Sequence, residues 1–501
     1  MTFDVVVVGS GGGALVAAHL AQKAGLSTVV LERTAMVGGT SAYSGGACWL
    51  PGSAVQRRAG IDDSTASARE YLEALLPRPL SPLVEVFLAE APRVVERLEA
   101  DDAFAFEWLP FPEYFDAPGR VTMGRSIQPV AVRRDELPPE VADLVRPPVE
   151  RDRAGTAGRR TLTGGQALVA RALHAFLRDG GTVLTGHHVT GYVVEDEVVV
   201  GVEATGPDGP TRVHSRRGVI AAAGGFEGNP RLRAAHGVPG DAAWTMAPAG
   251  TNAGELLEAG IALGARVDHL QHGWLCPGLE QPDGHGSFTL GFRSGVMVDG
   301  RGRRYANECL PYDRFGDAMA ASPDRVPSYL VFDSREGGRL PAIAMPEGEP
   351  AEHLAAGTWL RADTLDELAE QLGMPDLVGT VQRFNGFAAT GTDEDFGRGA
   401  DEYDRFFAGG DGPNPALVPL DTPPYLAARF VLSDLGTKGG LVTDEHARVL
   451  HEGGRPIRGL YATSNSAASI FGPVYPGPGA PLGKAFVFAA RAVDHLTQEK
   501  P

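Results

Sequence analysis

The first 32 residues of the chain follow an order of strand, glycine turn, helix, strand and acidic residue. Residues 1–8 end in four consecutive valines, and the glycine-rich turn at 9–14 leads into an alanine-rich stretch at 15–24. A second apolar run at 27–31 ends at Glu32. This order and spacing are typical of the βαβ unit that binds a dinucleotide. Because all the parts are present together, a glycine-rich turn without a ligand is the weaker interpretation.

Each small residue of the turn has a role in such a unit. Gly9 allows the tight turn, Gly11 lets backbone N–H groups approach a pyrophosphate, and Ala14 lets the helix pack closely on the strand. The helix N-terminus also offers unpaired N–H donors to phosphate. Glu32 stands about 20 residues further on, where its carboxylate can hold both ribose hydroxyls. We therefore expect a bound dinucleotide.

Length, charge and cysteine content limit the remaining possibilities. The chain has 501 residues, which exceeds one ordinary hydrophobic core and predicts two domains. A formal net charge of -18 argues against nucleic acid or an anionic membrane as a partner. Cys48, Cys276 and Cys309 lie too far apart for metal-ligand spacing and indicate reduced thiols in the cytoplasm. No metal site is predicted.

We expect neither a targeting segment nor a membrane segment. No apolar stretch is long enough to span a bilayer, so no transmembrane segment is expected. The first apolar run has no basic region before it and already belongs to the first strand, so we expect no signal peptide. These observations predict a cytoplasmic protein, with association at a membrane surface left open.

Apolar periodicity indicates how the chain is organised. Helices are expected at 62–102, 166–178, 252–265 and 483–497, and strands at 182–184, 191–195, 198–204, 211–215, 218–223 and 459–463. The stretch 133–160 is rich in Arg, Glu and Pro and is interpreted as a solvent-exposed segment that extends away from the core. We predict an α/β chain in which one dinucleotide-binding domain, residues 1–266 and 435–501, is interrupted by an inserted domain of mixed strands and helices, residues 267–434.

The glycine-rich motifs recur in an order that resembles the fumarate reductase and 3-ketosteroid dehydrogenase flavoproteins. These motifs are Gly9-Ser10-Gly11-Gly12-Gly13, Glu32-Arg33, Gly38-Gly39-Thr40-Ser41, Ser44-Gly45-Gly46, Ala223-Gly224-Gly225-Phe226 and Gly459-Leu460-Tyr461-Ala462. A further segment, Tyr475-Pro476-Gly477-Pro478-Gly479-Ala480, resembles the 3-ketosteroid Δ1-dehydrogenases specifically. The resemblance implies a Rossmann-like FAD-binding domain of the glutathione-reductase type, interrupted by an α+β catalytic or capping domain. It also implies removal of two hydrogens from ring A of a 3-ketosteroid or a similar cyclic ketone.

The resemblance assigns cofactor contacts to positions that match the family's motifs. The pyrophosphate would be faced by Gly9, Gly11 and Gly12, and the adenosine ribose would be held by Glu32. The ribityl chain and flavin would be lined by Thr40, Ser41, Gly45, Gly46, Asn465, Pro481 and Leu482, and the adenine would meet the backbone of Val189. The same motifs also place at the cofactor Ala14, Arg33, Gly39, Ala223 and Gly224. The segment 41–46 contains no histidine, so the FAD is expected to be non-covalent.

The same resemblance assigns the groups that polarise the ketone to one loop. In the family, a tyrosine hydroxyl and a backbone N–H polarise the 3-keto oxygen, and Tyr475 and Gly479 match these positions. They lie in a loop bent by glycine and proline, which can aim both donors at one oxygen. Composition alone favours a rigid turn without a catalytic role. The position of the loop just before the expected flavin-edge segment favours the catalytic interpretation.

Tyr312 is the candidate base that takes a proton from C2, while C1 passes a hydride to the flavin N5. Fumarate reductases share the Asn307-Glu308 landmark and have a proton-donating arginine where this chain has Tyr312. A tyrosine with the ordinary pKa of about 10 is a poor base, so a lowered pKa or a proton relay is required. Tyr114 matches the family's helper tyrosine, with a packed loop aromatic as an equal alternative. Arg314 is out of register and is interpreted as a surface or structural residue.

Three other functions stay open at this point. A 3-ketosteroid 4,5-(5α)-dehydrogenase would share FAD and Tyr312 and remove hydrogens elsewhere in the ring. A fumarate-reductase-type enone reductase is disfavoured because the arginine is missing. A non-catalytic binding protein on this fold is the remaining alternative, since fold alone does not imply activity. The sequence shows no second dinucleotide fingerprint, so we expect a quinone or a dye-like electron acceptor.

Two positions depart from the family's pattern. Ser464 precedes Asn465 where glycine is usual, and Lys484 stands in the last helix where relatives have an uncharged residue. We expect FAD binding to tolerate both changes, which bear on the identity of the steroid. The adjacent His187 and His188 point to opposite sides of a strand and are assigned to structure.

Overall fold

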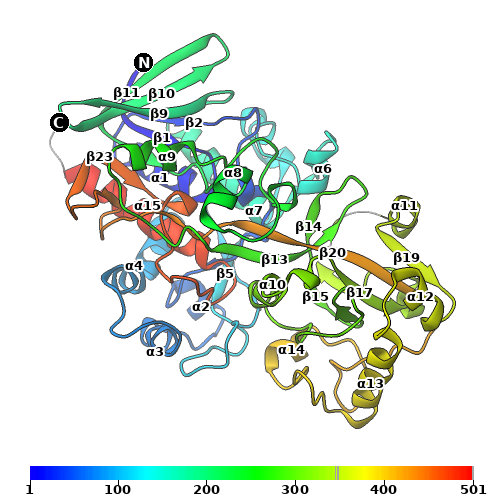
Figure 1. The fold of residues 1–501 in the computed structure, drawn as a ribbon. Helices are drawn as coiled ribbons and strands as arrows, with labels where there is room; N and C mark the ends of the chain where they lie inside the picture. The colour runs from blue at the N-terminus through cyan, green and yellow to red at the C-terminus, as the bar shows by residue number, and fades with distance from the viewer. Residues whose placement is uncertain (345, 347–348, 499–501) are drawn as a thin grey trace. The chain divides into compact units, whose positions relative to one another are not determined.

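The computed structural model describes residues 1–344, 346 and 349–498 and divides into two compact units (Figure 1). Unit 1 comprises Met1–Val238, Ala247–His272 and the chain from Gly436 onward. Unit 2 comprises Pro239–Met246 and Gly273–Leu435. Each unit has its own central sheet and its own hydrophobic core. Among the described residues, no helix combines the length and the apolar character needed to cross a membrane.

The helices of unit 1 are α1 Gly12–Lys23, α2 Ala54–Arg58, α3 Thr65–Leu75, α4 Pro82–Glu99, α5 Pro139–Ala142, α6 Val149–Arg153, α7 Gly164–Arg178, α8 Pro230–His236, α9 Glu255–Ala262 and α15 Ala480–Gln498. Its strands are β1 Thr2–Val8, β2 Thr28–Leu31, β3 Cys48–Trp49, β4 Phe106–Trp108, β5 Ser126–Pro129, β6 Val132–Arg133, β7 Thr161–Leu162, β8 Thr182–Leu184, β9 His188–Glu195, β10 Val198–Gly206, β11 Gly209–Ala221, β12 Val267–Asp268, β21 Gly440–Leu441, β22 Arg448–Leu450 and β23 Pro456–Ala462.

The helices of unit 2 are α10 Tyr312–Ala320, α11 Pro350–Ala356, α12 Leu365–Leu372, α13 Leu377–Thr390 and α14 Glu402–Phe406. Its strands are β13 Gly273–Glu280, β14 Gly286–Phe288, β15 Leu290–Phe292, β16 Val296–Val298, β17 Ser328–Asp333, β18 Ala342–Ala344, β19 Trp359–Ala362 and β20 Tyr425–Thr437, whose last residues belong to unit 1.

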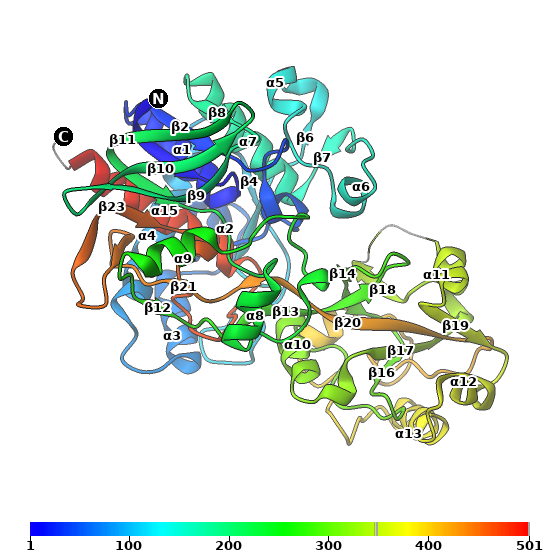
Figure 2. The ribbon, with the colours of Figure 1, turned by 45° about the horizontal axis from the view of Figure 1, so that its top comes forward.

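The main sheet of unit 1 follows the path β22-β23-β11-β1-β2-β8. β1 pairs in parallel with β2 on one side and with β11 on the other. Figure 2 shows the N-terminal strands close to β23 and α15 from the far end of the chain. The strand order reverses at β1, and open α/β sheets bind ligands at the carboxyl ends of strands at such a point. The sheet therefore places the glycine turn after β1 where a dinucleotide binds.

One strand of this sheet is longer than the sequence predicts. The predicted strands at 211–215 and 218–223 are a single strand, β11, which pairs with β10 at one end and with β1 at the other. The register with β1 shifts where Ser215 and Gly218 face Phe3 and Val5. This irregularity takes up the two intervening arginines, so the polar residues that divide the apolar pattern do not end the strand.

Two other segments also differ from the sequence expectation. The helical region at 62–102 is two helices, α3 and α4, and Ser81 caps the second through a hydrogen bond from Val84 N–H. The stretch 133–160 contains the short elements β6, α5 and α6 and is not wholly solvated. Arg146 is buried and donates to Asp152 and to Thr34 Oγ1, both at 2.5 Å. The charged residues of this stretch therefore include a partly buried ion pair between Arg146 and Asp152.

Unit 2 is built on a six-stranded sheet with the path β14-β13-β20-β17-β16 and β19 beside β20. Successive residues of β17 alternate between two cores, Leu330 in one and Val331 in the other, as a pleated strand with both faces covered requires. Phe315 of α10 packs in the first core, and Leu368 of α12 and Val381 of α13 pack in the second. The sheet therefore gives α10 a rigid support.

A buried histidine joins three helix ends of unit 1. His19 of α1 is fully buried, and its two ring nitrogens each lie 3.9 Å from a carboxylate oxygen, one of Asp101 and one of Asp179. Lys23 and Arg178 already pair with Asp101, at 2.6 and 2.7 Å. Because Lys23 and Arg178 already neutralise the carboxylate of Asp101, we interpret His19, Asp101 and Asp179 as part of an ion-pair cluster and not as metal ligands. Burial lowers the pKa of His19 to about 4, although the charge of Asp101 opposes this shift.

The free energy of unfolding should therefore fall as the pH drops from neutral toward the pKa of His19. Between pH 6.5 and a pH of about 4, His19 binds a proton in the unfolded chain but not in the folded protein. The contribution of the neutral His19 to the free energy of unfolding is fully present above pH 6.5. About 2–3 kcal/mol of it is lost by the lower end of this pH range. Thermal unfolding of the wild type and His19→Gln at neutral and mildly acidic pH should show the smaller drop in Tm for His19→Gln. Equal drops in both proteins would contradict this account.

Candidate active site

The glycine turn after β1 leads into α1 without a capping side chain of its own. Gly11 is the N-cap without a side-chain cap, and Gly12 N–H donates to Ser41 Oγ at 3.0 Å. Gly9 has a φ of +98°, and a Cβ at this position would lie 2.4 Å from the carbonyl oxygen of Ala222. Any larger residue at Gly9 would have to displace backbone. The turn thus presents a helix N-terminus that is suited to phosphate.

Glu32 has a fixed carboxylate at the end of β2. It is 7% exposed, accepts a hydrogen bond from Ser10 Oγ, and accepts two from Thr34 N–H and Oγ1, both at 2.8 Å. The backbone carbonyl of Glu32 accepts from His187 N–H at 2.8 Å. Val189, just beyond, has a buried side chain. Val189 thus stands two residues after His187, which hydrogen-bonds to Glu32, and the contact of its backbone with adenine stays a prediction.

The segment after β2 holds a buried hydroxyl that protein atoms do not satisfy. Thr40 Oγ1 is buried without a hydrogen-bond partner among the described residues. Gly39 and Gly45 face open space, since no heavy atom lies within 4 Å of a Cβ built on either glycine. A buried polar atom in a native structure is normally paired with protein, water or ligand. The unpaired hydroxyl and the open glycines fit the FAD expected from the sequence.

The C-terminal segment returns to the glycine turn. Ser466 Oγ accepts from Ala223 N–H at 3.0 Å and donates to Gly224 O at 2.9 Å. Leu482, in the first turn of α15, lies 3.3 Å from where a Cβ of Gly12 would stand. Candidate cofactor residues from the start, middle and end of the chain therefore come together at one end of the parallel sheet.

The other candidate cofactor residues occupy less open positions. Ala14 is fully buried within α1. Arg33 Nη1 and His188 Nε2 both contact Glu255 Oε1, at 2.7 and 2.9 Å. Gly46 has a φ of +71° and lies against the backbone of residue 164. Asn465 lies in the short 3₁₀ turn Ser464–Ser466, and Pro481 lies in the first turn of α15 beside Leu482. The contact with Glu255 is consistent with a structural role for His188.

The two departures from the family's pattern contact each other. Lys484 is 4% exposed, and its Nζ donates to the carbonyl oxygens of Ser464 at 2.7 Å, Ala467 at 2.8 Å and Ala468 at 3.3 Å. Burial lowers the pKa of Lys484 to about 7. Ser464 has a φ of +56°, in the left-handed region that favours glycine. The lysine therefore holds the carbonyl of a residue whose backbone is strained, directly before Asn465.

Lys484→Met should weaken FAD binding by about tenfold or more, with little change in Tm. The substitution frees the turn that carries Asn465, and it also removes the desolvation cost of a buried charge. Titration of the apoprotein with FAD, followed by quenching of flavin fluorescence, measures the affinity. Ser464→Gly relieves the positive φ and should restore part of the affinity in the Lys484→Met background. An unchanged FAD affinity in Lys484→Met would show that the turn does not need the lysine.

The structure brings Tyr114 and Tyr475 together in unit 1. Their rings lie 5.2 Å apart at 75°, and both side chains are buried. Gly479, on the same loop as Tyr475, has a φ of +84°, and a Cβ there would lie 2.1 Å from the carbonyl oxygen of Ala47. No hydrogen bond from Gly479 N–H to another described residue is found, while its carbonyl accepts from Trp49 N–H at 3.1 Å. The loop therefore keeps one backbone donor available.

Tyr312 is the first residue of α10 in unit 2. It is 7% exposed, and the ring of Phe288 meets it edge-on at 4.9 Å. A small cavity has Tyr312, Leu290, Phe292 and Phe407 among its lining residues. Arg314, two residues further, is exposed, as its interpretation as a surface residue requires.

A buried charge cluster fixes the segment that leads to Tyr312. Arg304 binds both carboxylate oxygens of Glu308, at 2.7 and 2.8 Å, and also pairs with Asp393 at 2.9 Å. Asn307 Nδ2 donates to Asp404 Oδ2 at 2.9 Å, and Asn307 Oδ1 accepts from the backbone of the residue at 309. The Asn-Glu landmark is therefore a structural anchor that sets where α10 begins.

Comparisons with known proteins agree with this fold and this motif order. The model of the FAD binding domain family matches residues 4–482. The 3-oxosteroid 1-dehydrogenase of Rhodococcus opacus is 39% identical over 517 residues, covering 99% of this chain and 98% of the relative. The 4-oxocyclohexanecarboxylate 2-dehydrogenase of Sinomonas cyclohexanicum is 35% identical over 541 residues, covering 96% of this chain and 90% of that relative.

A solved structure gives the same result. The 3-ketosteroid Δ1-dehydrogenase of Sterolibacterium denitrificans, in complex with 1,4-androstadiene-3,17-dione, superposes with a TM-score of 0.91 at 31% identity, and the match covers 100% of both chains. The predicted α/β fold with an FAD-binding domain is confirmed, and FAD is the cofactor. By its matching family model and its full-length relatives, this chain belongs to the FAD binding domain family and, within it, to the 3-oxosteroid 1-dehydrogenase flavoproteins.

Proposed function

We propose that the protein dehydrogenates ring A of a 3-ketosteroid, introducing a double bond between C1 and C2. The observation that carries this proposal is the loop at 475–479, where the Tyr475 hydroxyl and an available Gly479 N–H belong to one rigid turn beside Tyr114. The full-length likeness to 3-oxosteroid 1-dehydrogenases supports it.

The loop at 475–479 would polarise the 3-keto oxygen. Two hydrogen-bond donors on one carbonyl oxygen stabilise the negative charge that develops there when the neighbouring C–H loses its proton. Preorganisation matters because donors that need not reorient lower the barrier most. Tyr475 is buried and packed against Tyr114, so its hydroxyl has little freedom to turn away.

Tyr312 would take the proton from C2. A tyrosine acts as a base at neutral pH only if its phenolate is stabilised. The position of Tyr312 in the first turn of α10 provides part of this stabilisation, since a helix N-terminus favours negative charge. Asp313 shares that turn, and in its charged form it opposes a second negative charge on Tyr312, so the helix N-terminus must outweigh it. Tyr114 would receive or relay the proton, and bound FAD supplies the hydride acceptor at N5.

The electron acceptor and the compartment are inferred from the dinucleotide motif and from the cysteines. The chain carries one dinucleotide motif, at its N-terminus, so a quinone or a dye-like molecule would reoxidise the flavin. Cys48, Cys276 and Cys309 are free and buried, as is usual in a reducing compartment, which supports a cytoplasmic location.

A smaller cyclic ketone is a second candidate substrate. The likeness to a 4-oxocyclohexanecarboxylate 2-dehydrogenase, at 35% identity, favours it. The chemistry would be unchanged, because a ketone carbonyl acidifies the adjacent C–H in either ring. Dehydrogenation at C4–C5 of a 5α-steroid is the remaining alternative and differs in the position of the new double bond.

The test is anaerobic mixing of the purified FAD-bound protein with three ketones in turn. These are androst-4-ene-3,17-dione, 5α-androstane-3,17-dione and 4-oxocyclohexanecarboxylate. The proposal predicts loss of flavin absorbance at about 450 nm with the first steroid and a product two mass units lighter. If 4-oxocyclohexanecarboxylate alone bleaches the flavin, the substrate is the smaller cyclic ketone and not a steroid. No bleaching with any of them would overturn the proposal.

A further inference from the structure

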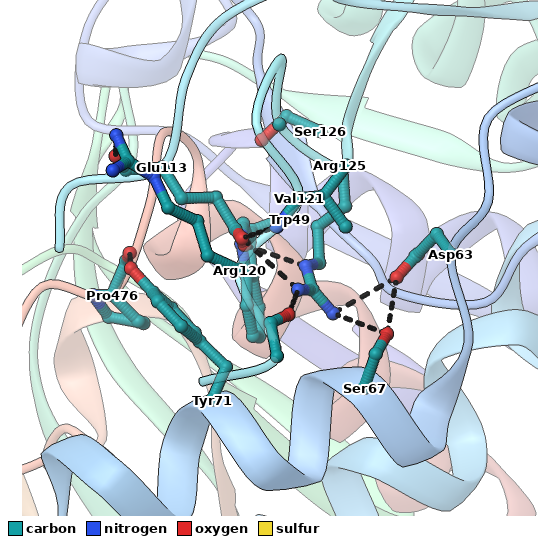
Figure 3. A network of polar contacts seen from close by, with 12 residues as sticks. Trp49, Asp63, Ser67, Tyr71, Glu113, Arg120, Val121, Arg125, Ser126 and Pro476 are labelled. Carbon is teal, nitrogen blue, oxygen red and sulfur yellow. Dashed lines mark hydrogen bonds and ion pairs between the residues drawn. The ribbon is translucent and has the colours of Figure 1, made fainter. Parts of the chain in front are cut away.

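One tyrosine hydroxyl ties together the two segments that carry Tyr114 and Tyr475. Tyr71 of α3 is fully buried, and its hydroxyl donates to the Pro476 carbonyl oxygen at 2.7 Å. The same hydroxyl accepts from Phe115 N–H at 3.1 Å. Figure 3 shows Tyr71 rising from α3 toward Pro476. The two hydrogen bonds therefore fix backbone atoms directly after Tyr114 and directly after Tyr475.

The loop at 475–479 is held largely by hydrogen bonds from other segments. Pro476 and Pro478 have no N–H, so the loop has few donors to close on itself. Its carbonyls instead accept from three separate segments: Tyr71 donates to Pro476 O, Ser126 Oγ donates to Pro478 O at 2.6 Å, and a strand N–H donates to Gly479 O. The orientation of the loop is thus set from outside.

The segment carrying Tyr114 is anchored on its other side by a buried ion pair (Figure 3). Arg125 Nε lies 2.6 Å from Glu113 Oε1, and its Nη2 lies 3.1 Å from Glu113 Oε2. Asp63 accepts from Arg125 at 3.0 Å, and the indole N–H of Trp49 donates to Glu113 at 2.9 Å. Glu113 directly precedes Tyr114, so the segment is held by an ion pair before the tyrosine and by Tyr71 after it.

We propose that Tyr71 is a positioning residue that sets Tyr114 against the loop at 475–479, an inference that rests on the function proposed above. Its hydroxyl is hydrogen-bonded to the backbone of both segments. Arg125 is less suitable for a test, because removing one partner of a buried ion pair strongly destabilises the folded protein. Tyr71→Phe keeps the ring and removes only the bridging hydroxyl.

The experiment compares Tyr71→Phe with Tyr461→Phe, a matched control in the same unit whose buried hydroxyl contacts His495 at 2.9 Å. With a ketone that reduces the wild-type flavin, Tyr71→Phe should lower kcat by roughly tenfold to a hundredfold, with KM and FAD content nearly unchanged. In a Tyr475→Phe background the same change should cost much less, because the two act through one interaction. Tyr461→Phe should leave kcat near the wild-type value.

A second readout does not depend on the substrate. In protein labelled with 3-fluorotyrosine, Tyr71→Phe should move the ¹⁹F resonances of Tyr114 and Tyr475, whereas Tyr461→Phe should not. If none of the ketones reduces the flavin of the wild-type enzyme, the proposed function fails. The ¹⁹F resonances alone then test whether Tyr71 positions Tyr114 and Tyr475. Unmoved resonances would overturn the inference, as would a kcat within about twofold of wild type or a loss that adds fully to that of Tyr475→Phe.

Discussion

Tyr312→Phe should lower the rate of flavin reduction by about a hundredfold to ten-thousandfold while FAD stays bound. The ring of Tyr312 packs edge-on against Phe288, and phenylalanine keeps that contact. Only the hydroxyl that would accept the C2 proton is lost. FAD should stay bound because the glycine turn and Glu32 belong to unit 1, whereas Tyr312 belongs to unit 2. Anaerobic stopped-flow absorbance measures the rate, and the protein-bound flavin spectrum measures FAD content.

The matched control for this change is Tyr305→Phe in the same unit. The Tyr305 hydroxyl contacts Ser328 Oγ at 2.8 Å, and the change removes a buried hydroxyl of the same kind. We expect Tyr305→Phe to affect Tm more than turnover. If Tyr312→Phe turned over at the wild-type rate, or if both variants lost activity equally, Tyr312 would not be the base.

Tyr475→Phe should lower kcat and kcat/KM together, by about a hundredfold to a thousandfold. The donor stabilises charge that appears on the ketone oxygen only as the C–H bond breaks, so ground-state binding should change little. The Tyr475 ring contact with Tyr114, at 5.2 Å, is retained by phenylalanine. Steady-state kinetics with a dye acceptor gives both constants.

A different kinetic pattern would reassign Tyr475. A raised KM with kcat unchanged would make it a residue that only binds the ring. Residual activity in Tyr475→Phe is expected, because Gly479 N–H stays in place as the second donor. Full activity in this variant would remove the loop from the mechanism.

The cofactor half of the fold was predictable because its parts are consecutive in the chain. β1, the glycine turn, α1, β2 and Glu32 follow one another within 32 residues, and each has a local signature. The length of β11 was not predictable, because two arginines interrupt its apolar pattern where the register with β1 shifts. A shift of this kind depends on the neighbouring strand, which a local pattern does not contain.

The residues that support the site carried no local signature. Tyr71 lies in an amphipathic helix, where a buried aromatic side chain is typical of the hydrophobic core. Pro476, whose carbonyl oxygen accepts its hydrogen bond, is 405 residues away. Arg125 stands in a Gly- and Pro-rich loop, and its partners at 63 and 113 are visible only once the chain is folded. Lys484 and Ser464 each stood out as a departure from the family, yet only the structure shows their contact at 2.7 Å.

The measurement that tests the central claim most directly is anaerobic reduction of the enzyme by androst-4-ene-3,17-dione carrying deuterium at C1. Removal of hydride from C1 and of a proton from C2 predicts slower flavin bleaching with the deuterated steroid, and NMR of the product should show a new double bond between C1 and C2. Bleaching at an unchanged rate with a double bond elsewhere in the ring, or no bleaching at all, would contradict Δ1-dehydrogenation.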